Sequence, residues 1–191
     1  MLSMPGPTGR AFLYVLRMSG AEDLLKVGLT HDPVARWSSF HRRWFEAFDL
    51  DHSLLVETES RADAQALETS LHRSLVAHGC PAPLTMRLAA GGATEWYRGA
   101  WPAVRDFVDR CGAEGYTVHA EARTHVALAM RARRDRLATV VDQAFREHLD
   151  RLLVPAQLDA VRDLVDAHRA LGEDLSDLAA PEVFAALRLQ A

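Results

Sequence analysis

Cysteine is scarce in this sequence, and long apolar runs are missing from it. Cys80 and Cys111 are the only cysteines, which excludes a disulfide-rich scaffold and favours reduced thiols. No stretch approaches the roughly 18 consecutive apolar residues of a membrane span, and the run Ala11–Leu16 is too short for a signal peptide. We therefore expect a soluble, cytoplasmic protein with no membrane partner.

Excess positive charge is also missing, although the distribution of charge is informative. The 191 residues are 49% hydrophobic and 25% charged, with a formal net charge of -4, a composition that excludes a disordered chain. Residues 1–151 carry 19 basic and 19 acidic residues, whereas residues 152–191 carry 3 and 7. The whole negative excess therefore lies in the last forty residues, and bulk charge alone does not indicate a nucleic-acid-binding protein.

Lysine is almost absent, because Lys26 is the only lysine among 22 basic residues. Two interpretations of this arginine bias stay open. A GC-rich genome favours arginine codons, and planar guanidinium groups suit bidentate recognition of phosphate.

Apolar patterns and turn residues predict the order β-β-α-β-α-β-α between positions 11 and 112, which is typical of an α/β or α+β domain. The predicted strands are 11–16, 24–28, 50–58 and 94–97, and the predicted helices are 33–45, 61–78 and 102–112. We expect a flexible N-terminus over residues 1–10, one domain over 11–112 and a mainly helical module over 113–191. In that module a short strand at 116–122 precedes helices at 124–153, 159–171 and 181–189, with an acidic linker at 172–180.

Polar side chains stand within or beside apolar patterns of the first domain at Tyr14, Arg36, Glu68 and His72. A buried carboxylate is costly unless it is paired or binds a metal. A carboxylate that holds Mg²⁺, a guanidinium and a phenol together suit phosphodiester hydrolysis. A structural ion pair between Glu68 and Arg36, with His72 as a half-buried histidine, is the alternative interpretation.

Five motifs follow one another in order in the first domain: Phe12-Leu-Tyr14, Lys26-Val-Gly28-Leu-Thr30, Arg36, Leu67-Glu68…His72 and Glu95-Trp-Tyr97. Together they resemble the GIY-YIG nuclease superfamily, most closely its phage and bacterial branch with a Lys-hydrophobic-Gly second motif. The resemblance covers about residues 11–110. It implies a three-stranded antiparallel sheet flanked by helices, and an endonuclease that cuts DNA with Mg²⁺ or Mn²⁺.

The resemblance also implies roles for individual residues. Tyr14 orients or deprotonates the attacking water, Arg36 stabilises the pentavalent phosphate, and Glu68 binds the metal. His41 lies near the place of an accessory histidine, and His72 and Glu95 belong to the rim of the site. Gly28 allows close approach of the backbone, Thr30 fixes the turn, and Lys26 lies at the mouth of the site.

Two departures from the family pattern favour a second hypothesis. Phe12 replaces the glycine of the first motif, and Val27 replaces the tyrosine of the second. Since valine cannot transfer a proton, Tyr14, Lys26 or water must do so alone. A non-catalytic DNA-binding regulator built on a degenerate domain therefore remains open.

Arginines gather in the C-terminal half, at Arg131, Arg133, Arg134 and Arg136. A basic cluster is typical of phosphate binding, although a solvated helix face is the common alternative. The surrounding strand and helices resemble a ribbon-helix-helix DNA-binding unit, which implies a homodimer because its strand pairs with a second copy. The alternative is a single long helix that packs back on the first domain or pairs two subunits, which would give a homodimer through the C-terminal helices. A helical protein-interaction module with an acidic partner is the third hypothesis.

Overall fold

The structure, a computed structural model, describes residues 9–87 and 93–189. The chain forms two compact units, Met1–Arg123 and Thr124–Ala191, and each is described by itself. Most of the flexible N-terminus predicted for residues 1–10 lies outside the described residues. Within the described ranges, no helix is long and apolar enough to cross a membrane.

A six-stranded antiparallel sheet forms the centre of the first unit, with the order β4-β5-β2-β1-β3-β6. Its strands are β1 (Ala11–Met18), β2 (Leu24–Thr30), β3 (Phe48–Thr58), β4 (Gly79–Cys80), β5 (Trp96–Arg98) and β6 (Thr117–His119). The mixed α/β class is confirmed, but the prediction of a three-stranded sheet is wrong. The short strands β5 and β6 correspond to strands predicted at 94–97 and 116–122, whereas the two residues of β4 carry no periodic pattern of their own.

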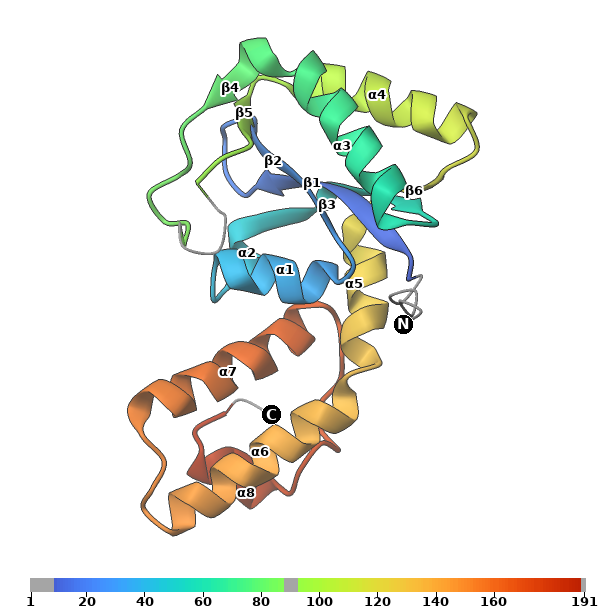
Figure 1. Cartoon of the computed structure of the whole chain (residues 1–191). Helices are drawn as coiled ribbons and strands as arrows, with labels where there is room; N and C mark the ends of the chain where they lie inside the picture. The colour runs from blue at the N-terminus through green and yellow to red at the C-terminus, as the bar shows by residue number, and fades with distance from the viewer. Residues whose placement is uncertain (1–8, 88–92, 190–191) are drawn as a thin grey trace, which may run out of the picture. The chain divides into compact units, whose positions relative to one another are not determined.

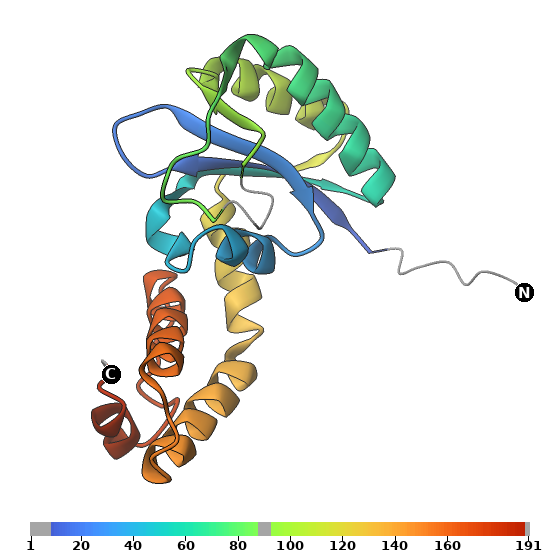
Figure 2. The same ribbon diagram turned by 60° about the vertical axis from the view of Figure 1, so that its left-hand side comes forward.

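Helices cover both faces of this sheet (Figures 1 and 2). They are α1 (Pro33–Phe40), α2 (Trp44–Ala47), α3 (Arg61–Ser74) and α4 (Trp101–Ala113), with a short 3₁₀ turn at Val76–His78. Because strand side chains alternate, Leu13 and Val15 pack in the core beneath α3 and α4. Tyr14 between them points to the other face, where its ring contacts Trp37 and Phe40 of α1.

The helix predicted for residues 33–45 is divided into α1 and α2. His41 is extended, with φ -149° and ψ 135°, and its backbone N–H donates to the Trp37 carbonyl. Its ring Nδ1 accepts a 3.2 Å hydrogen bond from the Arg43 backbone. This local hydrogen bonding ends α1 without the glycine or proline that a sequence pattern needs as a stop signal.

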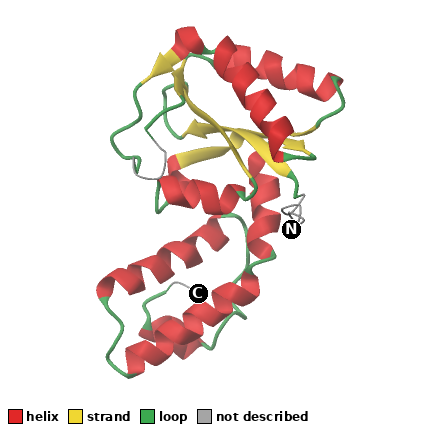
Figure 3. Cartoon of the chain, in the orientation of Figure 1, coloured by secondary structure: helices red, strands yellow, loops and turns green. Residues whose placement is uncertain are grey.

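The second unit is helical, and strands are confined to the first among the described residues (Figure 3). It contains most of α5 (Ala122–Arg131), and α6 (Arg134–Leu149), α7 (Pro155–Ala170) and α8 (Pro181–Ala186). Its core joins α6, α7 and α8 through Val141, Val165 and Phe184. The long helix predicted for residues 124–153 is thus broken between α5 and α6.

The ribbon-helix-helix interpretation is contradicted by the pairing of β6. That unit needs its strand to pair with a second copy, whereas here Thr117, Val118 and His119 pair with residues 57, 56 and 55 of β3. The strand therefore belongs to the sheet of the first unit. The homodimer that the interpretation implied remains a prediction without this support.

Candidate metal centre

One face of α3 carries the polar side chains of the candidate site. Ser60 caps this helix by accepting a 3.1 Å hydrogen bond from the Asp63 backbone. Leu71 faces the core. Gln65, Glu68 and His72 follow one another at intervals of three and four residues, which places them on one neighbouring face. Glu68 is buried and His72 is half-buried.

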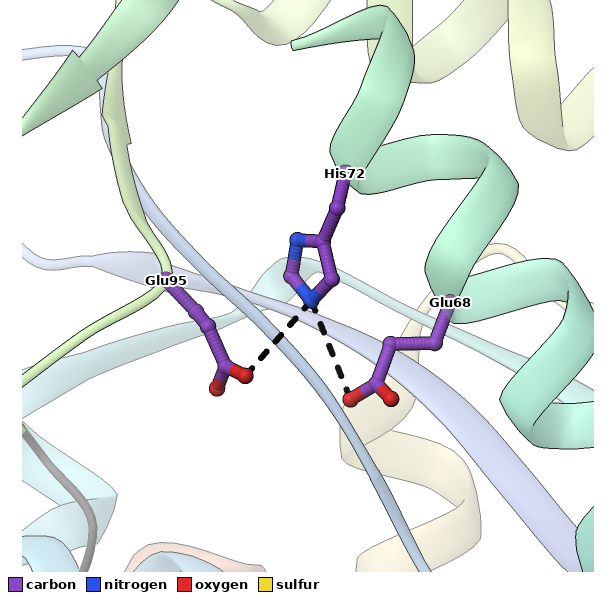
Figure 4. A group of neighbouring side chains, drawn as sticks. All are labelled: Glu68, His72 and Glu95. Carbon is purple, nitrogen blue, oxygen red and sulfur yellow. Dashed lines mark ion pairs between the residues drawn. The ribbon is translucent and has the colours of Figure 1, made fainter. Parts of the chain in front are cut away.

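Glu95, in the loop before β5, meets this face of α3. The Nε2 atom of His72 lies 3.8 Å from Oε1 of Glu68 and 3.7 Å from Oε1 of Glu95. Figure 4 shows the imidazole between the two carboxylates. The nearest potential ligand atoms of the three residues all lie within 4.8 Å of one another. The structure thus brings together three residues predicted from the sequence, although Glu95 is distant from the other two along the chain.

Each of the three side chains is fixed through its other polar atom. Oε2 of Glu68 accepts a 2.6 Å hydrogen bond from Gln65. His72 Nδ1 shares a 2.6 Å hydrogen bond with the Tyr97 hydroxyl. Oε2 of Glu95 accepts a 3.3 Å hydrogen bond from Lys26 Nζ. One donor atom of each residue is therefore left facing the other two, an arrangement typical of metal ligands with oriented outer partners.

The donor set fits a divalent metal ion. His72 Nε2 is buried and has no hydrogen-bond partner among the described residues, since even the nearer carboxylate oxygen, at 3.7 Å, lies beyond hydrogen-bonding distance. If Nδ1 donates its proton to the Tyr97 oxygen, the Nε2 lone pair points into the space between the carboxylates. The two carboxylates suit Mg²⁺ or Mn²⁺, and the imidazole suits a transition metal.

The backbone of Glu95 lies in the left-handed region, with φ 67°. This conformation is strained for a residue other than glycine and persists where neighbouring structure enforces it. Lys26 supplies that constraint, because its ammonium donates 2.8 Å to the Thr94 carbonyl as well as 3.3 Å to the Glu95 side chain. The Val27 backbone N–H also donates to the Glu95 carbonyl at 3.1 Å.

Lys26 does not lie at the mouth of the site as predicted. Its side chain is completely buried, with the ammonium 5.2 Å from the centre of the Phe40 ring and 5.8 Å from that of Trp96. Burial lowers the pKa of Lys26, while the Glu95 carboxylate opposes that shift. Its catalytic role stays a prediction, and the contacts place it as a support for Glu95.

Tyr14 is also completely buried. Burial raises the pKa of Tyr14 to about 12, although the positive charge of the neighbouring Arg36 guanidinium acts in the opposite direction. The carboxylates of Glu95 and Glu68 raise it further. A phenol with this pKa keeps its proton at neutral pH, which favours orientation of a water over its deprotonation.

Gly28 gives the Tyr14 ring its space. The two residues are paired across β1 and β2, and a Cβ atom on Gly28 would lie 2.3 Å from the Tyr14 hydroxyl oxygen and 2.6 Å from Cζ. No side chain larger than hydrogen fits here unless the tyrosine moves.

Gly28→Ala is expected to lower the free energy of unfolding by about 1–3 kcal/mol. The buried Tyr14 ring, in contact with Trp37 and Phe40, has little room to retreat. Urea denaturation followed by tryptophan fluorescence measures the change. Gly112→Ala is the control, because a Cβ there meets Val118 at an ordinary 3.8 Å and adds helix propensity. Equal stability of both variants and the wild type would contradict the proposed clash.

The other predicted residues of the first unit lie on α1 and around it. Arg36 is half-buried with its guanidinium over the Phe40 ring, 4.6 Å from the ring centre. Its positive charge opposes the rise in the pKa of Tyr14. Thr30 fixes the start of α1, because its hydroxyl accepts from the Asp32 backbone N–H at 3.0 Å. The ring of His41 accepts a hydrogen bond from the backbone of Arg43. His41 does not belong to the cluster of candidate metal ligands. The roles of these residues in substrate binding or catalysis remain predictions.

The arginine cluster is not a uniform basic surface. Arg134 donates 2.7 Å hydrogen bonds to Glu173 and to the Asp174 carbonyl, and it pairs with Asp177. The acidic linker thus pairs with one of the four predicted DNA contacts. The DNA-binding role of Arg131, Arg133, Arg134 and Arg136 stays a prediction.

The sequence analysis did not predict that Gln65 and Tyr97 hydrogen-bond the candidate metal ligands Glu68 and His72. Gln65 precedes Glu68 by three residues, and Tyr97 follows Glu95 by two. The helical interval was a usable signal for Gln65. Tyr97 belongs to a quoted motif, but its contact with His72 spans 25 residues and leaves no local pattern.

Comparison with protein families gives one result for this region. The family model described as the T5orf172 domain matches residues 11–112, more than half of the 191 residues. No curated protein and no solved structure matches the chain.

Proposed function

The chain belongs to the T5orf172 domain family, a nuclease-related family, and from that premise we propose that it is a metal-dependent endonuclease of the GIY-YIG type that hydrolyses DNA. The cluster of Glu68, His72 and Glu95 carries this proposal. Its three donor atoms face one another while Gln65, Tyr97 and Lys26 hold the remaining atoms. Metal ligands are commonly oriented by outer partners of this kind.

Glu68, His72 and Glu95 are the residues that would hold the ion. A bound Mg²⁺ or Mn²⁺ supplies Lewis-acid polarisation of a phosphoryl oxygen and lowers the pKa of a water molecule. Membership of a nuclease-related family supports this chemistry, and the identity of the metal is our proposal. The two carboxylates support these ions, because carboxylate oxygen is a usual ligand of both.

Arg36 is the proposed stabiliser of the phosphate. Its guanidinium is planar and permanently charged, so it can make two parallel hydrogen bonds to phosphate oxygens and offset negative charge in the transition state. Burial dominates the raised pKa of the Tyr14 hydroxyl, and Arg36 lies close enough to oppose that rise. This proximity supports a common site for the two residues.

Proton transfer is assigned without a second tyrosine, since Val27 occupies that position. Tyr14 keeps its proton at neutral pH and can therefore donate a hydrogen bond to a water or a phosphate oxygen. Glu95 and Glu68 are the carboxylates able to accept the proton of an attacking water.

A non-cleaving DNA-binding regulator is the second candidate function. Two observations favour it: valine stands at position 27, and the Tyr14 side chain has no exposed surface. A degenerate site of this kind would still bind a metal and DNA without hydrolysis.

Cleavage of supercoiled plasmid by the full chain separates the two functions. In the presence of Mg²⁺ or Mn²⁺, we expect nicked and linear products. EDTA should stop the reaction, and added metal should restore it. If the plasmid is shifted on a gel but stays intact with both metals, the regulator is correct and the endonuclease is not.

A further inference from the structure

A cleft of about 560 Å³ lies beside Arg36, and its lining includes Thr30, His31, Arg36, Ser39 and Arg61. We propose that this cleft binds a phosphate of the DNA backbone a few nucleotides from the one that is cut, with Arg61 as its main contact. The inference rests on the proposed function, because it describes how the substrate of that site is held.

Two guanidinium groups reach the cleft from separate elements. Arg36 comes from α1, and Arg61 is the exposed first residue of α3. A cation at this position faces the positive end of the helix dipole, which is unfavourable. An anion in the cleft would relieve this repulsion and interact with both guanidinium groups. Asp32, which also lines the cleft, has one carboxylate oxygen accepting from the Ala35 backbone as the cap of α1.

The cleft and the metal ligands share one face of α3. Arg61, Gln65, Glu68 and His72 stand at intervals of four, three and four residues, which returns them to the same side of the helix. Seven residues of helical rise separate Arg61 from Glu68 by about 10 Å along the axis. One strand of DNA carries a charge about every 3.4 Å of its axis. A strand cut at Glu68 therefore places a phosphate near Arg61 within a few nucleotides.

The opposite side of the α3 start is acidic. A second cleft, of about 620 Å³, is lined by Glu57, Glu59, Asp63 and Glu114, and Arg10 is the one basic residue in its described lining. Arg10 already pairs with Glu57 at 2.8 Å. A polyanion would be repelled there, so the sign of the charge across the first turn of α3 favours a DNA path on the Arg61 side.

The test is DNA binding by Arg61→Gln in the full chain, with Arg73→Gln as the matched control. Arg73 is exposed in the last turn of the same helix and does not line the cleft. We measure the Kd for a fluorescent 20-base-pair duplex in EDTA across a series of KCl concentrations. Arg61→Gln should weaken binding about three- to tenfold. It should also make the negative slope of log K against log salt shallower by about one. Arg73→Gln should change Kd less than twofold.

Two further measurements separate binding from folding and from chemistry. Removal of a cation from the start of α3 should leave the melting temperature of Arg61→Gln unchanged or raise it, so a folding defect would be visible as a decrease. The cleavage rate at saturating DNA should stay within about twofold of wild type while KM rises, because Arg61 does not touch the scissile phosphate.

The possible failures are distinct. Equal Kd values and salt slopes for the two variants overturn the phosphate site and leave the endonuclease intact. Wild-type protein that binds DNA but cleaves with neither metal overturns the endonuclease, and the binding comparison still decides the phosphate site. Wild-type protein that does not bind DNA overturns both.

Discussion

Glu68→Gln is expected to abolish metal binding and to reduce DNA cleavage about a thousandfold, with the fold unchanged. The substitution keeps the shape of the side chain and its contact with Gln65, but removes the negative charge that faces His72 and Glu95. Loss of a charged ligand removes several kcal/mol of metal-dependent transition-state stabilisation. A factor of ten in rate corresponds to about 1.4 kcal/mol, so three such factors match that loss.

Two independent readouts test this expectation. Titration with Mn²⁺, followed by electron paramagnetic resonance, should show a bound ion in wild type and none in Glu68→Gln. Plasmid cleavage gives the rate. Glu59→Gln is the matched control, because it makes the same change at an exposed carboxylate just before α3 and should retain both properties. A Glu68→Gln protein that binds Mn²⁺ as tightly as wild type would refute the proposed metal centre.

The strands of the central sheet differ in how far their sequence predicts them. The run Ala11–Leu16 and the segment Leu24–Gly28 are apolar and followed or preceded by turn residues, so β1 and β2 were predictable. β4 and β6 consist of two and three residues. Their pairing partners lie on β5 and on β3, far from them in the sequence, and nothing in their own residues specifies that pairing.

The residues of the candidate site also differ in whether a local sequence pattern predicts their contacts. Glu68 and His72 share a helix face at an interval of four residues, and a local pattern suffices for such a pair. The hydrogen bond from Lys26 to Glu95 joins residues that are 69 positions apart in the sequence. The rings of Phe40 and Trp96 contribute to the burial of the lysine. A sequence motif marked Lys26 as unusual, but only the packing shows that it supports Glu95 from inside the protein.

The ion pairs of Arg134 were not predictable for a related reason. Its local surroundings, residues 131–136, are basic, so a phosphate partner was a reasonable expectation. Its actual partners lie 39 to 43 residues later, in the acidic segment at 173–177. Two charged segments that look independent in the sequence therefore neutralise each other in the fold.

Glu173→Ala is expected to destabilise the second unit by about 3–5 kcal/mol, the usual effect of breaking a buried ion pair on one side. Glu173 accepts 2.7 Å hydrogen bonds from both His168 Nδ1 and Arg134. The exposed fractions of the His168 and Glu173 side chains are 1% and 8%. The alanine would leave the imidazole and the guanidinium without their common partner.

Two spectroscopic probes locate this effect. All four tryptophans lie between residues 37 and 101, inside the first unit, so their fluorescence reports unfolding there. Circular dichroism at 222 nm also reports the helices of the second unit. We expect Glu173→Ala to shift the denaturation midpoint of the dichroism signal more than that of the fluorescence. Glu182→Ala, at an exposed glutamate in the first turn of α8, should cost less than about 1 kcal/mol.

The Glu173 carboxylate makes the stability of the second unit depend on pH. Burial alone would raise the pKa of Glu173, but the hydrogen bonds from His168 and Arg134 and their charges outweigh it, so the pKa is lowered in the fold. The stabilisation is therefore complete above the unfolded glutamate pKa of about 4.3, and it is lost as the pH falls through the lower folded value. Acidification below about pH 4 should destabilise wild type more than Glu173→Gln, which has no carboxyl to protonate. Parallel losses of stability in the two proteins would show that other carboxylates cause the acid sensitivity.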